Sequence, residues 1–169
     1  MKQTKRIAII GLPGSGKSTF AAKLGAELDL PTHHLDKHMF TAGGKKRNKQ
    51  EFIAIQQEML DQDAWIIEGC STSTFEMRFA KAQTILYFRP SRLLCLFRAL
   101  KRRFFPDNTL CDTAEGCSKV FTWEMVKYTW NFDKDKKPLL NALLKQYPHL
   151  EMRIFTSRRA IEDYLSTCK

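Results

Sequence analysis

Residues 5–18 read KRIAIIGLPGSGKS, a short apolar run followed by a glycine-rich loop, and this stretch decides the fold. Its second part, residues 11–18, matches the pattern G-x-x-x-x-G-K-[ST] in full. In this pattern the glycines let successive backbone N–H groups turn toward a di- or triphosphate, and the next helix points the positive end of its dipole at the same anion. A random chain of this length would match less than about once in a hundred. The stretch therefore predicts a buried strand, a phosphate-binding loop (P-loop) and a helix.

Two side chains of the loop have chemistry of their own. Lys17 is expected to reach the β and γ phosphates of ATP, and the Ser18 hydroxyl is expected to bind Mg²⁺. We therefore predict ATP and Mg²⁺ as the ligands of this loop. The predicted nucleotide-binding residues of the loop are Gly11, Pro13, Gly14, Ser15, Gly16, Lys17, Ser18 and Thr19.

Apolar runs and helical periodicity alternate along the rest of the chain. We predict strands near 5–10, 32–35, 65–67, 84–88 and 153–155, and helices near 19–28, 50–61, 91–105, 123–133, 138–145 and 157–165. In the helix near 91–105 the apolar residues form one stripe, at 93, 96, 97, 100 and 104. This alternation predicts one α/β domain over residues 1–169: a three-layer P-loop NTPase fold with a parallel sheet of about five strands and helices on both faces.

Composition excludes several classes of protein. With 169 residues, 43% of them apolar and 27% charged, the chain is long enough for one core and too apolar to be disordered. No apolar run approaches the length of a membrane span. Five cysteines without a C-x-x-C pair favour reduced thiols in a cytoplasm. We expect a cytoplasmic monomer with no membrane partner.

The net charge of +10 comes almost entirely from one segment. Residues 77–106 contain eight basic side chains and no acidic one, whereas the segments on either side are each within one charge of neutral. Such a concentration suits either the phosphates of a nucleotide or the backbone of a nucleic acid. The basic residues of the segment are Arg78, Lys81, Arg89, Arg92, Arg98, Lys101, Arg102 and Arg103.

Among P-loop proteins, the motifs present favour a small kinase. A GTPase needs Asn-Lys-x-Asp to bind guanine, and the sequence 48–51, NKQE, lacks the aspartate. No Asp-x-x-Gly switch motif occurs, and the chain has no room for helicase or transporter motifs.

At this point the chain resembles the adenylate-kinase-like branch of P-loop proteins, and within it the bacterial topology modulation proteins. The resemblance covers essentially the whole chain and implies an acceptor-side arm at about 36–62 and a helical lid at about 98–120. Besides the P-loop, the segments that carry it are HLDK at 34–37, WIIEG at 65–69, AEGC at 114–117, WNF at 130–132 and TSRR at 156–159.

The resemblance also implies roles for three residues on the acceptor side. Asp36 is expected to orient or deprotonate an acceptor hydroxyl, with a helix N-cap as the alternative. Glu68 stands where the family usually has aspartate and is expected to hold Mg²⁺ through water. Arg78 is expected to bind the acceptor, with a solvated helix arginine as the alternative.

Three further arginines are assigned to the nucleotide by the same resemblance. Arg98 and Arg102 match the pair before the lid, one against the adenine and the other on the transferring phosphate, while Arg158 follows the last strand near the adenine. No arginine lies between Arg103 and Arg153. This absence argues against a nucleoside monophosphate as the acceptor.

Three functions remain open from the sequence. The first is Mg²⁺-dependent phosphoryl transfer from ATP to a small-molecule or nucleotide acceptor, with Lys17, Asp36, Arg98 and Arg102 as the catalytic residues. The second is a nucleic-acid-associated regulator of DNA topology that uses ATP binding as a switch, and the third is a nucleotide switch without useful catalysis. No helix-turn-helix, zinc-finger or RNA-recognition signature supports the second function. The sequence does not name the acceptor.

Overall fold

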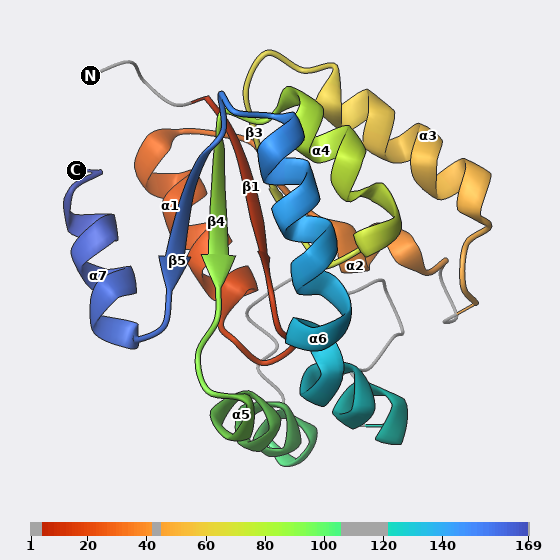
Figure 1. Ribbon diagram of the computed structural model, residues 1–169, viewed down its shortest axis with the longest axis vertical. Coiled ribbons are helices and arrows are strands. Elements are labelled where there is room, and N and C mark those ends of the chain that lie inside the picture. The colour runs from red at the N-terminus through yellow and green to blue at the C-terminus, as the bar shows by residue number, and fades with distance from the viewer. Residues whose placement is uncertain (1–4, 42–44, 106–121, 169) are drawn as a thin grey trace.

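Five parallel strands form one sheet in the computed structural model, which describes residues 5–41, 45–105 and 122–168 (Figure 1). The strand order is β2-β3-β1-β4-β5. The strand before the P-loop, β1, is therefore the central strand. The loop starts in the middle of the edge that is formed by the carboxyl ends of the strands. The strands are β1 (Arg6–Gly11), β2 (Thr32–His34), β3 (Trp65–Glu68), β4 (Thr84–Phe88) and β5 (Glu151–Phe155).

Helices cover both faces of this sheet, as predicted. Ile7 and Ile9 of β1 pack in one cluster with residues of α1 (Lys17–Leu28) and α7 (Arg158–Ser166). Ala8 and Ile10 alternate with them and pack in a second cluster, because successive side chains of a strand point to opposite faces. That second cluster includes residues of α3 (Lys49–Leu60), α4 (Phe75–Lys81) and α6 (Trp123–Gln146). The structure confirms the predicted α/β class.

Two short elements next to the sheet edge were not predicted. The helix α2 (Leu35–Met39) starts directly after β2, so the strand expected to reach residue 35 ends one residue earlier. The 3₁₀ turn η1 (Thr72–Thr74) lies between β3 and α4. Both elements stand between a strand end and the next long helix, where they shape the edge that carries the P-loop.

The prediction of two helices at 123–133 and 138–145 was wrong, because α6 is continuous through Pro138. A proline in a helix lacks the N–H that would bond to the carbonyl four residues earlier, so a break was expected there. Side chains on both sides of the proline pack into the same core: Phe132 before it is 1% exposed, and Leu140 after it is 3% exposed. This shared burial stabilises the unbroken helix.

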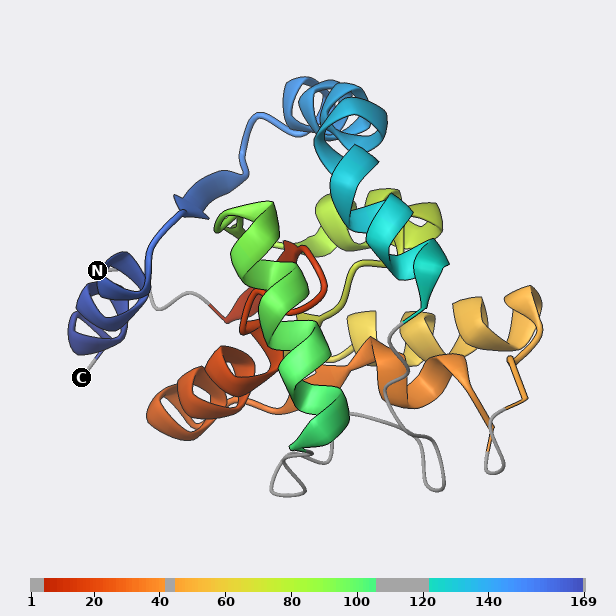
Figure 2. The ribbon, with the colours of Figure 1, turned by 90° about the horizontal axis from the view of Figure 1, so that it is seen from below.

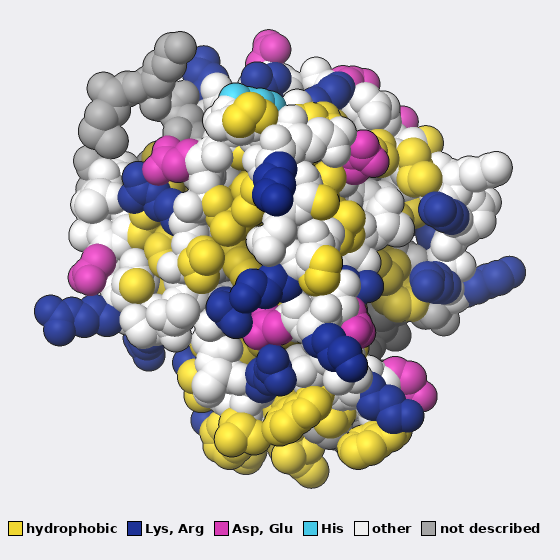
Figure 3. All heavy atoms as spheres, in the orientation of Figure 1, with side chains coloured by type: hydrophobic (Ala, Val, Ile, Leu, Met, Phe, Trp, Pro, Cys, Tyr) yellow, Lys and Arg dark blue, Asp and Glu magenta, His cyan; other side chains and the backbone are white. Residues whose placement is uncertain are grey.

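The apolar stripe of α5 (Arg92–Phe104) faces away from the rest of the domain. Its members Leu93, Phe97 and Phe104 are 70%, 64% and 68% exposed, whereas Cys95 on the opposite side is buried. Figure 3 shows this apolar surface at the lower end of the molecule. The helix crosses the end of the sheet instead of covering a face (Figure 2), and the side that carries Cys95 is buried. None of the described helices combines the length and the apolar character needed to cross a bilayer.

Candidate functional site

The carboxyl ends of the strands bring together residues that are far apart in the sequence. In a parallel sheet these ends share one edge, where ligands of open α/β proteins bind. The P-loop follows β1, Asp36 follows β2, Glu68 ends β3 and Arg158 follows β5. The structure therefore places four of the predicted site segments at one edge.

The P-loop lies next to α5, which crosses in front of the end of the sheet in the view of Figure 2. Gly14 has a φ of 76°, and a Cβ added to it would come within 2.2 Å of the Cys95 carbonyl oxygen of α5. A side chain at this position is therefore excluded both by the left-handed backbone and by the contact with α5. This close approach places the basic helix over the phosphate-binding loop.

Two polar side chains inside the loop are buried. The Ser15 hydroxyl has no hydrogen-bond partner among the described residues, although the residue is 1% exposed. Lys17 is 8% exposed, and its Nζ donates to the Leu12 carbonyl at 2.9 Å, within the loop. Buried hydroxyl groups usually have partners, so the unpaired Ser15 Oγ fits a loop built to surround an anion.

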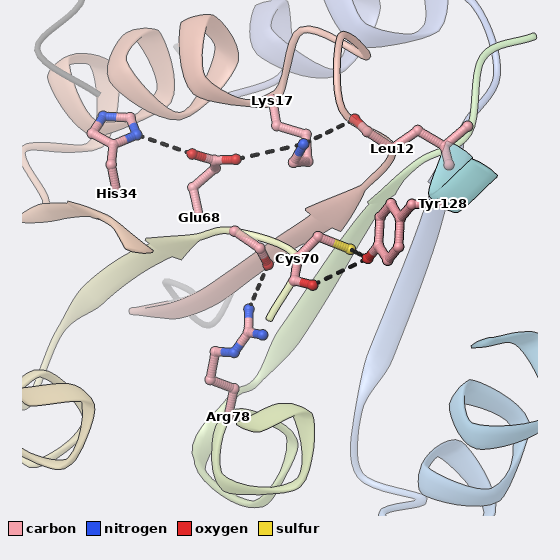
Figure 4. A network of polar contacts seen from close by, with 8 residues as sticks. Leu12, Lys17, His34, Glu68, Cys70, Arg78 and Tyr128 are labelled. Atoms are coloured by element: carbon pink, nitrogen blue, oxygen red, sulfur yellow. Dashed lines mark hydrogen bonds and ion pairs between the residues drawn. The ribbon is translucent and has the colours of Figure 1, made fainter. Parts of the chain in front are cut away.

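Glu68 connects the P-loop to β2 (Figure 4). Its carboxylate is buried, with Oε1 3.7 Å from Lys17 Nζ and Oε2 3.0 Å from His34 Nδ1. Sequence analysis did not assign His34 a role at Glu68. The two residues are register partners on the neighbouring strands β2 and β3, and the sequence does not encode strand neighbours in any local pattern.

The residues of this edge fit a bound Mg²⁺. Hard cations of this kind take oxygen ligands, and Ser18 on the first turn of α1 and the Glu68 carboxylate supply a hydroxyl and an anionic oxygen. Lys17 balances part of the charge of Glu68. A cation beside Glu68 and a phosphate beside Lys17 would each meet a group of opposite charge.

Arg98 and Arg102 lie on α5, the helix that crosses the P-loop. Both are partly exposed, and neither has an ion-pair partner among the described residues. Burial raises the pKa of the Cys95 thiol, while the nearby charges of Lys17 and Arg98 act in the opposite direction. Arg98 and the P-loop lysine are therefore close to the same thiol. The rest of the predicted lid, residues 106–120, lies outside the described residues, as does the AEGC segment.

Arg78 is a buried arginine that holds the loop after β3, and the alternative of a solvated helix residue was wrong. Its side chain is 0% exposed, and its Nη1 and Nη2 donate to the carbonyls of Gly69 and Ser71, each at 2.8 Å. The guanidinium also lies 5.0 Å from the centre of the Phe75 ring. Burial lowers the pKa of Arg78 to about 10. Its predicted contact with an acceptor stays a prediction.

Tyr128 of α6 contacts the loop after β3 (Figure 4). Its hydroxyl donates to the Cys70 carbonyl at 3.3 Å and lies 3.4 Å from Cys70 Sγ. Burial, then the neighbouring Cys70, and then Asp36 raise the pKa of Tyr128. We call Asp36, Cys70 and Tyr128 the acceptor corner. No sequence pattern predicts a site role for Tyr128, because an aromatic residue at helical spacing is usual in a core.

Asp36 is exposed and sits in the first turn of α2, so the alternative of an N-cap carboxylate was wrong. The N-cap of α2 is His34. Arg158 is also exposed, and its Nε lies 2.6 Å from Glu162 Oε1 on the same helix. The predicted roles of both residues at the acceptor and the adenine stay predictions.

Four of the eight basic residues of the segment have partners in other parts of the protein. Asp133 of α6 accepts hydrogen bonds from Arg89 and Arg92 at the start of α5, at 2.9 Å and 3.2 Å. Burial alone would raise the pKa of Asp133, but these arginine hydrogen bonds lower it. Lys81 pairs with Asp61, and Arg78 is buried. The charge left over the P-loop is thus smaller than the sequence indicates.

Comparisons with known proteins identify relatives by fold. No protein-family model matches the chain, and no curated protein matches its sequence. The shikimate kinase from Acinetobacter baumannii in complex with shikimate matches with a TM-score of 0.63 at 15% identity, over 97% of this chain and 90% of that one. The shikimate kinase from Bacteroides thetaiotaomicron matches with a TM-score of 0.56 at 16% identity, over 97% of this chain and 95% of that one.

These likenesses show that the chain has the fold of the P-loop kinases. The similarity is confined to structure, because the sequence identity is low. The resemblance to topology modulation proteins has no support from the comparisons and stays a prediction.

Proposed function

We propose that the protein is an ATP-dependent phosphotransferase that acts on a small-molecule acceptor and requires Mg²⁺. The observation that carries the proposal is the contact between Lys17 of the P-loop and the buried Glu68, under a helix that carries Arg98 and Arg102. The described part of the chain thus combines a phosphate-binding loop, a carboxylate for a cation and unpaired cations at one sheet edge. The likeness to two kinases supports the same class of reaction.

The protein's own residues have separate roles in this reaction. The P-loop N–H groups and Lys17 hold the phosphates of ATP in position, and Asp36 accepts the proton of the attacking hydroxyl. Arg98 and Arg102 stabilise the charge that develops on the transferring phosphoryl group. Ser18 and Glu68 would hold Mg²⁺, which supplies additional positive charge beside the phosphates.

The charge pairing disfavours a nucleic-acid interface as the main purpose of the basic segment. Phosphate-backbone binding needs an accessible row of cations, yet Arg78 is buried, and Arg89 and Arg92 contact Asp133. What supports the kinase is that, among the described residues, Arg98 and Arg102 have no ion-pair partner and lie on α5, the helix that contacts the P-loop.

The test uses substitutions at two lysines of the same helix. Lys17→Ala should abolish ATP turnover with an acceptor panel of nucleosides, nucleotides and polyols, because the β and γ phosphates lose their lysine contact. Lys23→Ala is the matched control, since Lys23 is exposed on α1 and should leave turnover unchanged. Equal turnover by the wild-type protein and Lys17→Ala would overturn the proposal.

A further inference from the structure

We propose that α5 is a membrane-surface helix, whose outward apolar stripe inserts into the headgroup region of a bilayer that contains anionic lipids. The proposal goes beyond the proposed phosphoryl transfer and does not depend on it. It rests on the side chains that α5 points outward and on the charges that border them.

The outward face of α5 carries large apolar side chains along its whole length. Leu93, Phe97, Leu100 and Phe104 recur at helical spacing and are all exposed, and Phe105 directly after the helix is exposed as well. Figure 3 shows apolar side chains gathered at this end of the molecule, with Lys and Arg side chains above them. Exposed apolar side chains that gather on one face mark a surface that binds another molecule or a membrane.

Two tryptophans of α6 lie at the same end of the molecule. Trp123 and Trp130 belong to the first turns of α6, which lie beside α5 at the lower end in Figure 1. Both are exposed, and the Trp130 ring centre is 5.8 Å from the guanidinium carbon of Arg92 at the start of α5. Tryptophan favours the boundary between a membrane and water, because its ring is apolar and its N–H is polar.

Every charged residue of α5 is basic. Lys101 is exposed on the outward face, one turn after Phe97 and one turn before Phe104. The stem of such a lysine covers apolar surface while its ammonium group reaches the lipid headgroups. Arg98 and Arg102 border the same face. Leucine and phenylalanine on one face with basic residues beside them are typical of helices that lie in a membrane interface, where the cations attract anionic lipids.

The same charges disfavour a second copy of the chain as the partner. Two copies that met through α5 would bring their basic helices together, and the chain has a net charge of +10. Two acidic residues of α6 already have basic neighbours, because Asp133 pairs with Arg89 and Arg92, and Lys127 lies one turn after Glu124. An anionic bilayer offers both an apolar phase and the opposite charge.

The stripe and the P-loop contact lie on opposite sides of α5. Cys95, whose carbonyl lies next to Gly14, is buried, whereas Phe97 is exposed. A bilayer against the stripe therefore leaves the P-loop contact in place. The expectation of no membrane partner depended on the lack of an apolar run long enough to span a bilayer, and a helix that lies in the interface does not need one.

Sedimentation with vesicles tests the proposal on the wild-type protein. One set of vesicles is phosphatidylcholine alone, and the other is phosphatidylcholine and phosphatidylserine in equal parts. The protein should bind the anionic vesicles at least about tenfold more tightly, and added KCl should weaken this binding. The fluorescence of Trp123 and Trp130 should shift to shorter wavelength on binding. Binding to neither set, or to both equally, would overturn the proposal.

Substitutions on the stripe separate its effect from that of the net charge. Phe97→Ser should weaken binding to the anionic vesicles about tenfold, because a phenyl ring loses its apolar surroundings. Lys101→Glu should weaken it at least about tenfold, because repulsion replaces attraction. The matched controls are Leu139→Ser, in the second half of α6, and Lys23→Glu, exposed on α1; both should bind like the wild type. Equal losses in stripe and control variants would overturn the proposal.

Other occupants of the stripe give different results. Thermal unfolding of Phe97→Ser should match the wild type, and a marked loss of stability would mean that the chain itself covers the stripe. Analytical ultracentrifugation without lipid should show a monomer. A dimer that Phe97→Ser dissociates would identify a second copy as the partner, and tighter binding to a single-stranded oligonucleotide than to the anionic vesicles would identify a nucleic acid. Each of these three results would overturn the proposal.

Discussion

Lys17 and Glu68 lie 51 residues apart in the sequence, and their Nζ and Oε1 atoms are 3.7 Å apart in the folded protein. Both side chains are almost completely buried, at 8% and 2% exposure. The attraction between a buried lysine and a buried carboxylate offsets part of the cost of removing both groups from water. The same pairing keeps the P-loop lysine beside the carboxylate that we assign to Mg²⁺.

His34 is expected to act as a positioning residue for Glu68, since its Nδ1 lies 3.0 Å from Oε2. His34→Asn should lower kcat about tenfold and raise the Mg²⁺ concentration needed for half-maximal activity, because partners that orient a metal-binding group affect its affinity by about this factor. Titration of activity with Mg²⁺ measures both effects. His33→Asn is the control, because His33 contacts Gln62. An unchanged Mg²⁺ requirement in His34→Asn would contradict this role.

Arg98 and Arg102 should contribute to the transfer step. Arg98→Ala and Arg102→Ala are each expected to reduce kcat about a hundredfold, as for the loss of one charge-stabilising donor in a transition state. Lys101→Ala, on the exposed side of the same helix, should retain the wild-type kcat. Steady-state kinetics with the best acceptor of the panel measures kcat for the three variants. An equal loss of kcat in all three would contradict this role and indicate a general effect on α5.

Arg78 should be essential for stability. Arg78→Met removes the donor to the Gly69 carbonyl and one of the donors to the Ser71 carbonyl, which keeps Thr74, so the free energy of unfolding should fall by about 2–4 kcal/mol. Urea denaturation measures the change, and Lys81→Met on the same helix should barely shift the midpoint, because its pair with Asp61 is exposed. Wild-type stability in Arg78→Met, combined with a raised acceptor KM, would instead show that Arg78 binds the acceptor.

The contacts of Asp133 predict a pH-dependent contribution to stability. The arginine hydrogen bonds lower the pKa of Asp133 in the folded state, so its stabilisation is complete above the unfolded value of 3.8 and is lost as the pH falls through the lower folded value. Asp133→Asn should cost about 1 kcal/mol at pH 7, since its partners are partly exposed to solvent.

Urea denaturation at several pH values tests this linkage. The difference between wild type and Asp133→Asn should shrink as the pH falls below 3.8. Asp135→Asn, exposed on the same helix, should match the wild type throughout. A difference that grows in acid would mean that the sign of the pKa shift is wrong.

The outward stripe of α5 predicts a substitution with little effect on stability. Phe97→Ser should change the free energy of unfolding by less than about 0.5 kcal/mol, because the side chain is 64% exposed. Phe132→Ala, at a side chain only 1% exposed in α6, should cost about 3–5 kcal/mol. Equal losses in the two variants, measured by chemical denaturation, would show that the stripe of α5 is buried in solution.

The sequence alone determined the class of fold and the position of the P-loop, because both depend on local patterns. The P-loop pattern lies within one short loop, so residues 11–18 contain the whole signal. The alternation of apolar runs with helical stripes was likewise sufficient to predict a parallel sheet covered on both faces. Pro138 shows where such local rules fail, since core contacts on both sides of it overrode the expected break.

Only the tertiary structure decided which distant residues meet. The pairing of His34 with Glu68 depends on β2 lying beside β3, and the contacts of Asp133 depend on α6 lying beside the start of α5. Periodicity detected the apolar face of α5 but not its direction, because a stripe has the same spacing whether it faces the core or solvent. The eight basic residues of 77–106 form one group in the sequence. In the folded protein, some of them contact other parts of the chain, whereas Arg98 and Arg102 lie on the helix that contacts the P-loop.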